Sequence, residues 1–172
     1  MHIPQHSPAA ERNLPPILQV LQALLPATGQ ALEVASGTGQ HVAGFAAALP
    51  GWTWQPSDAQ PDGFGSIGAW CAAAGVHNVR PPVLLDVLAA QWPSVGPAFA
   101  VPFALVYCAN MLHIAPWACC AALMQGAARH LAPHGQLVTY GPYLEGGEPT
   151  APSNAAFDAS LRQRNPAWGI RY

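Results

Sequence analysis

The chain has 172 residues and a formal net charge of −2; 51% of its residues are hydrophobic and only 8% are charged. This length and composition predict one domain with a sizeable core, and the scattered arginines argue against a nucleic-acid partner. Lysine is absent, which excludes a Walker-type phosphate loop and a pyridoxal enzyme. No apolar run is long enough to span a membrane and no signal peptide is visible, so we expect a cytoplasmic protein.

Turn residues and apolar periodicity predict five strands that alternate with helices and loops. Ser7 and Pro8 form a helix start with a capping side chain, and Pro15-Pro16 is expected to start a second helix that ends before Pro26. Ser153 is expected to cap the last helix. The strands are expected at about 30–35, 52–58, 79–85, 103–108 and 136–140, and the later helices at about 42–49, 63–74, 116–131 and 153–164.

This alternation predicts an α/β fold, in which a mostly parallel sheet carries helices on both faces. The prolines of the third strand place it near an edge of the sheet. We expect a single domain in three parts. These are an N-terminal helical segment over 1–29, a cofactor-binding core over 30–142, and a C-terminal helix and tail over 143–172.

The segment 31–41 has the most informative pattern: a short apolar strand with Glu33 near its end, then a turn with Gly37 and Gly39 that opens a helix. Such a turn places backbone N–H groups and a helix N-terminus at the carboxyl edge of the sheet, where nucleotide-like ligands bind. A carboxylate before the turn suits a cationic amine or sulfonium, and Val42 breaks the G-x-G-x-x-G fingerprint. The segment favours S-adenosylmethionine over NAD; a tight turn that only packs the helix is the alternative.

Two further acidic residues lie at predicted strand ends. Asp58 lies 21 residues beyond Gly37, near the spacing at which an acidic side chain accepts hydrogen bonds from ribose hydroxyls. Asp86 could accept from an adenine amino group. Each residue taken alone could equally be a cap or a solvated turn residue, but with Glu33 they place three carboxylates at successive strand ends.

With these residues, the chain over about 30–142 resembles the class I S-adenosylmethionine-dependent methyltransferases. The turn over 131–135 (LAPHG) also resembles the L-x-P-G-G element of that superfamily. Three blocks resemble an uncharacterised methyltransferase-like branch found in bacteria and animals: SPAAERN at 7–13, CANMLH at 108–113 and SNAAFD at 153–158. The resemblance implies a three-layer Rossmann-like sandwich and S-adenosylmethionine as the cofactor.

The chain departs from the superfamily pattern in two places. Ala35 replaces the usual first glycine of E-x-G-x-G-x-G, which narrows the space near the carboxypropyl end of the cofactor. The superfamily sheet normally finishes with an antiparallel pair of strands, which has no counterpart before Tyr172. We therefore expect the fifth strand to be an open edge, covered by a protein partner or a second copy, unless the chain is a fragment or a short variant.

In folds of this type the methyl acceptor lies just past the fourth strand, where the chain has Asn110 and His113. We expect Asn110 to position the acceptor and His113 to accept its proton or to orient it, because an imidazole with a pKa of about 6.5 suits this work. The alternative is that His113 only caps or bonds backbone at the start of the following helix.

Polar residues of the first and last helices are candidates for binding the acceptor. Glu11, Arg12 and Asn13 could fold over the site as a lid, or could form a solvated first turn. Asn154 and Asp158 could close the acceptor pocket, or could belong only to the capping turn of the last helix.

The sequence therefore predicts methyl transfer from S-adenosylmethionine to a small-molecule acceptor. The four cysteines lack C-x-x-C spacing, so we expect small buried side chains and no metal site. The alternative is a non-catalytic methyltransferase-like module that acts through a protein partner. An NAD-dependent oxidoreductase is disfavoured by the turn pattern and by the absence of lysine.

Overall fold

A computed structural model describes residues 3–149 and 151–172. Its main sheet has five parallel strands in the order β3-β2-β1-β4-β5, and a separate antiparallel pair, β6-β7, follows. The strands are β1 (Gly29–Val34), β2 (Trp52–Asp58), β3 (Val83–Leu84), β4 (Phe103–Ala109), β5 (Leu131–Tyr140), β6 (Leu144–Glu145) and β7 (Glu148–Pro149). The helices are α1 (Pro8–Leu24), α2 (Gln40–Ala48), α3 (Phe64–Ala74), α4 (Ala118–His130) and α5 (Pro152–Arg164), with short 3-10 turns η1 (Pro61–Gly63) and η2 (Leu112–Ile114).

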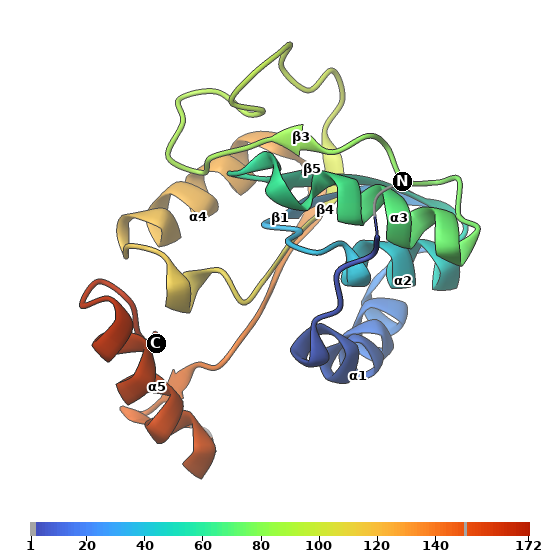
Figure 1. Cartoon of the computed structure of the whole chain (residues 1–172). Helices are drawn as coiled ribbons and strands as arrows, with labels where there is room; N and C mark the ends of the chain where they lie inside the picture. The colour runs from blue at the N-terminus through green and yellow to red at the C-terminus, as the bar shows by residue number, and fades with distance from the viewer. Residues whose placement is uncertain (1–2, 150) are drawn as a thin grey trace.

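Helices cover both faces of the sheet, as the sequence predicts. Figure 1 shows α1, α2 and α3 grouped on one side of the sheet, α4 on the other, and α5 set apart at the end of the segment that follows β5. Because alternate strand residues face opposite sides, β1 places Ala31 in the core beneath α1, α2 and α3, and places Leu32 in the core beneath α4. The strand order reverses between β1 and β4, and ligands of such sheets bind at this switch point.

The first helix differs from the sequence prediction. Pro15 and Pro16 do not start a second helix, because α1 runs unbroken from Pro8 to Leu24. Both prolines are exposed, and Ile17 and Leu21 anchor the next turn in the core. The predicted cap is confirmed: the Ser7 side chain accepts a hydrogen bond from Ala10 N at 3.3 Å.

Other elements also differ from their predicted bounds. Strand β5 begins at Leu131, so it includes the 131–135 segment that the sequence predicts to be a turn before the strand. The third strand is reduced to Val83–Leu84, with only an isolated bridge from Val79 to Trp54 before it; Pro81 and Pro82 between them have no N–H to donate. It does lie at an edge of the sheet, as predicted. Helix α5 begins at Pro152 after Ala151, so Ser153 lies in its first turn and is not its cap.

The outer edge of β5 has no neighbouring strand in the described sheet. None of the described helices is long and apolar enough to cross a membrane.

Candidate functional site

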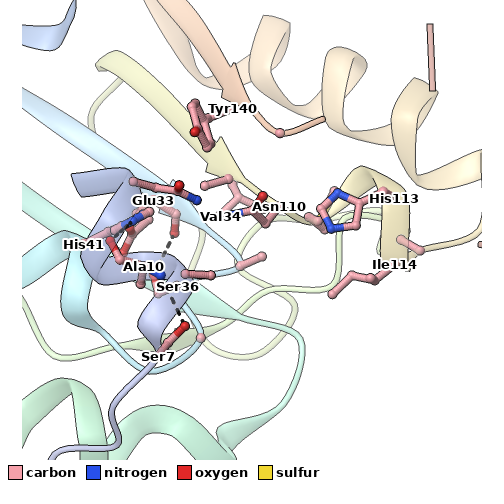
Figure 2. Close-up of a pocket in the computed structure, with 18 of the residues that line it drawn as sticks. Ser7, Ala10, Glu33, Val34, Ser36, His41, Asn110, His113, Ile114 and Tyr140 are labelled. Atoms are coloured by element: carbon pink, nitrogen blue, oxygen red, sulfur yellow. Dashed lines mark hydrogen bonds between the residues drawn. The ribbon is translucent and has the colours of Figure 1, made fainter. Parts of the chain in front are cut away.

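A cavity of about 1050 Å³ lies at the carboxyl ends of the strands. Its walls come from α1, from the turns after β1, β2 and β4, from the segments after β3 and β5, and from the start of α5. Figure 2 shows Glu33, Asn110, His113 and Tyr140 around this space, with Ser7 and Ala10 of the N-terminal segment on the side of Ser36 and His41. Small-molecule pockets span about 300–1,000 Å³, so this cavity is at the large end of that range.

The turn after β1 has three residues with positive φ: Ala35 at 58°, Gly37 at 55° and Gly39 at 88°. The left-handed region costs a residue with a Cβ about 1–2 kcal/mol, so the departure at Ala35 stores strain at the wall of the cavity. Asp58 braces this turn, since its carboxylate accepts from Gly37 N at 3.0 Å and from Gln60 N at 3.2 Å. The strand ends of β1 and β2 are thereby fixed to each other beside the cavity.

Glu33 is the most unusual group of the site. The residue is only 2% exposed, it lines the cavity, and its Oε2 has no hydrogen-bond partner among the described residues. Burial raises the pKa of its carboxyl to about 8, although a hydrogen bond with Ser36 opposes the shift; the charge of Asp58 raises the pKa further. The carboxyl therefore holds a proton at neutral pH unless a cation enters the cavity beside it.

Hydrogen bonds hold the N-terminal segment against the turn and its helix. Gln5 N donates to Ser66 Oγ at 2.8 Å, and Ser7 N donates to the side-chain oxygen of Gln40. His41 Nε2 lies 3.1 Å from Ala10 O, which can only accept, so Nε2 carries the proton and Nδ1 accepts from the Tyr107 hydroxyl at 3.3 Å. This part of the N-terminal segment is therefore a fixed wall of the cavity.

Asn110 and His113 face one small space at the other end of the cavity. Asn110 has φ 56° and donates from its backbone N to Tyr140 O at 2.8 Å. A Cβ added at Gly141 would lie 3.7 Å from His113 Nδ1 and 3.9 Å from Asn110 Oδ1. The absence of a side chain at Gly141 thus leaves room for a small group next to both polar atoms.

The imidazole of His113 is buried and packs edge-to-face against Phe157, with 5.4 Å between the ring centroids. Burial lowers its pKa below the usual 6.5, and the charges of Arg164 and Arg171 lower it further. A neutral imidazole can accept a proton. The main chain of His113 bonds the C-terminal tail, since Gly169 N donates to His113 O at 3.0 Å.

Nine of the twelve predicted site residues line the cavity: Arg12, Asn13, Glu33, Gly37, Asp58, Asp86, Asn110, His113 and Asn154. Three do not. Glu11 pairs with His6 at 3.0 Å in an exposed position. Gly39 is buried, and a Cβ there would meet Ile67.

Asp158 is the third residue outside the lining, and it fastens the tail of the chain. Its carboxylate accepts from Arg162 Nε at 2.8 Å and from Ile170 N at 2.6 Å. The hydrogen bond from Arg162 lowers the pKa of this carboxyl, burial opposes the shift, and the bond from Ile170 and the charges of Arg162 and Arg171 lower the pKa further.

Sequence reasoning missed several lining residues, among them Ser36, Tyr140, Gly141 and Phe157. Tyr140 and Gly141 could have been found, since they end the fifth strand and strand ends meet at one edge of a parallel sheet. Among the described residues, no cluster of three or more His, Cys, Asp or Glu side chains could hold a metal ion.

Comparison with known proteins identifies a family and a fold. The family described as "Protein of unknown function (DUF938)" matches residues 4–172. Among solved structures, S-adenosylmethionine-dependent methyltransferase SibL is 19% identical with a TM-score of 0.75, over 95% of this chain and 45% of that one. An O-methyltransferase family protein from Burkholderia thailandensis is 17% identical with a TM-score of 0.75, over 94% and 48%. CalO1, a methyltransferase of calicheamicin biosynthesis solved with SAH, is 16% identical with a TM-score of 0.69, over 95% and 44%.

These structures confirm the predicted fold, a Rossmann-like methyltransferase sandwich with a mostly parallel sheet. The chain spans about half of the length of each. The likeness concerns the fold, so the chemistry of this chain has to be argued from its own cavity.

Proposed function

The chain belongs to the DUF938 family of unknown function, and we propose from its cavity that it transfers the methyl group of S-adenosylmethionine to a small-molecule acceptor. The observation that carries the proposal is Glu33, a buried carboxyl with an unpartnered oxygen at the switch point of a methyltransferase-type sheet. S-adenosylmethionine is cationic at its sulfonium and its amino group, and either charge would compensate the buried carboxylate. The pyrophosphate of NAD would instead be repelled.

We assign the cofactor to residues of the 30–142 core. Glu33 and the turn around Gly37 would hold its methionine part, Asp58 its ribose and Asp86 its adenine. Asp86 is held in place by its own loop, because its carboxylate accepts from Leu88 N at 2.9 Å and its backbone N donates to Ser94 Oγ at 2.6 Å. Segments 1–29 and 143–172 would then cover the acceptor side of the same domain.

The bound cofactor supplies a methyl group already activated by its positive sulfur. The protein therefore has mainly to align the acceptor, and alignment alone can contribute about 7–11 kcal/mol of a barrier. Asn110 orients the acceptor atom through its side-chain amide. Where the acceptor atom is a hydroxyl oxygen, His113 takes the hydroxyl proton as that oxygen bonds to the methyl carbon. Burial keeps His113 neutral and able to do so.

Isothermal titration calorimetry with S-adenosylmethionine, and with NAD as the comparison ligand, tests this proposal. We expect the chain to bind S-adenosylmethionine and not NAD. Asp58→Asn should weaken this binding at least tenfold, because it weakens both the hydrogen bond to the ribose and the hydrogen bond from Gly37 N. Arg80→Gln is the control, because Arg80 bonds Gln30 at an exposed site away from the cavity. A folded chain that binds no S-adenosylmethionine would overturn the proposal in favour of a binding module that acts through a protein partner.

A further inference from the structure

Three carboxylates and one arginine are the charged residues that line the described cavity. Glu33 and Asp58 lie at the carboxyl ends of β1 and β2, and Asp86 follows β3; all three are assigned to the cofactor. Arg12 of α1 is the one arginine among the residues that line the described cavity. Arg12 is exposed at the cavity wall and makes no hydrogen bond or ion pair with any residue that the structure describes, whereas its neighbour Glu11 pairs with His6. An arginine that lines a cavity without a partner has all its N–H donors available to a ligand.

Two further arginines lie near His113 at the acceptor end. Arg164 and Arg171 lie close enough to His113 for their charges to lower its pKa. Arg171 donates to the carbonyls of Leu112 and Ala115 at 3.3 and 3.1 Å, and stacks over Trp117 at 5.3 Å. Neither Arg164 nor Arg171 lines the cavity, so the arginine in place to receive an anion bound there is Arg12.

Part of the wall near His113 is apolar. Met111, Ile114, Pro142 and Phe157 line the cavity near His113. Ile114 is 46% exposed and Phe157 is 38% exposed, although both belong to the cavity wall. Apolar side chains left accessible inside a cavity favour a ligand with an apolar body.

We propose that the methyl acceptor is an anionic small molecule with an apolar or aromatic body, and that Arg12 binds its carboxylate. The inference deepens the proposed function and rests on it. The body lies against Ile114 and Phe157, and the atom to be methylated reaches the space that Gly141 leaves beside Asn110 and His113. A carboxylate suits the site because a guanidinium binds it in a planar, two-bonded arrangement, and because the three acidic residues of the same cavity oppose a more highly charged anion.

Three aromatic carboxylates test the proposal: 4-hydroxybenzoate, 4-hydroxycinnamate and indole-3-acetate, each compared with its primary amide. Binding to the full chain saturated with S-adenosylhomocysteine is measured by calorimetry or ligand-observed NMR. We expect at least one carboxylate to bind tenfold or more tightly than its amide, as the worth of a charged hydrogen bond implies. Arg12→Gln should reduce this preference to within about threefold, and Arg12→Lys, which keeps the charge without the planar fork, should lie between.

Arg129→Gln is the matched control, because Arg129 is exposed on α4 and does not line the cavity; it should retain the full preference. Equal binding of acids and amides, a preference that survives in Arg12→Gln, or no binding by any carboxylate would each overturn the inference. S-adenosylhomocysteine, the product of the cofactor, is titrated first. If it binds and the carboxylates do not, only the acceptor assignment fails; if it does not bind, the proposed function fails as well.

Discussion

The buried carboxyl of Glu33 predicts a fold that loses stability as the pH rises, in the absence of any ligand. Its pKa in the folded chain is about 8, against 4.5 for an ordinary glutamate. Between these two values the folded chain binds one more proton than the unfolded chain, so the free energy of unfolding falls with rising pH. Below about pH 4.5 both states are protonated and the effect disappears.

The size of the effect follows from about 1.36 kcal/mol for each unit of pKa difference. The raised pKa of Glu33 should therefore lower the free energy of unfolding by on the order of 1 kcal/mol at pH 5, 3 kcal/mol at pH 7 and 5 kcal/mol above pH 8. Glu33→Gln removes the ionisation and keeps the shape. The difference in unfolding free energy between Glu33→Gln and wild type should grow by roughly 2–3 kcal/mol from pH 5 to pH 7 in favour of the variant.

Urea unfolding followed by tryptophan fluorescence at pH 5, 6, 7 and 8 measures this difference. Glu145→Gln, which removes an exposed carboxylate outside the cavity, is the control. Parallel pH profiles for wild type and Glu33→Gln would refute the reasoning, because they would mean that Glu33 ionises at an ordinary pH. Saturation with S-adenosylmethionine at pH 7 should remove a proton from Glu33, so calorimetry in two buffers of different ionisation enthalpy should detect proton release on binding.

The remaining predictions concern the acceptor end and the core. His113→Gln should lower kcat for an acceptor hydroxyl by about 10²–10⁴-fold without changing cofactor affinity; an unchanged kcat would exclude His113 as the base. Wild-type activity should decline with acid only below pH 6.5, since burial and then the charges of two arginines lower the pKa of His113. Gly141→Val should lower kcat/KM for the acceptor while S-adenosylmethionine still binds, because its side chain enters the space beside Asn110; unaffected turnover would place the acceptor elsewhere. Gly126→Ala should destabilise the chain by about 1–3 kcal/mol in urea unfolding, although Ala favours helices, because its Cβ would overlap the Trp92 ring; a more stable variant would contradict this packing.

The sequence predicts the sheet well because its strands are short apolar runs bounded by turns. The bounds of β2 are the predicted ones, and the glycine turn lies at the switch point as expected. The errors fall where tertiary contacts override a local signal. Pro15 and Pro16 read as a helix start, but Ile17 and Leu21 hold their turn in the core and the helix continues.

The site was predicted less completely, for a physical reason. Residues at strand ends, such as Asp58 and Asn110, can be placed from the topology alone because parallel strands share one carboxyl edge. The direction in which the side chain of a helix residue points cannot be predicted from the strand topology. Glu11 and Arg12 are adjacent in the sequence, yet Glu11 pairs outside the cavity and Arg12 lines it.

This difference bears on where acceptor specificity is encoded. The strand ends supply acidic groups suited to the cofactor, but the candidate carboxylate ligand, Arg12, belongs to the first helix and the apolar wall includes Phe157 of the last one. These two helices lie outside the five-stranded sheet, and hydrogen bonds fix each of them: His41 to Ala10 in the first, and Asp158 to Ile170 in the last. A shared fold supports many reactions through the segments placed around its site. The acceptor of this chain should therefore change with substitutions in α1 and α5, whereas cofactor binding should depend on the strand ends.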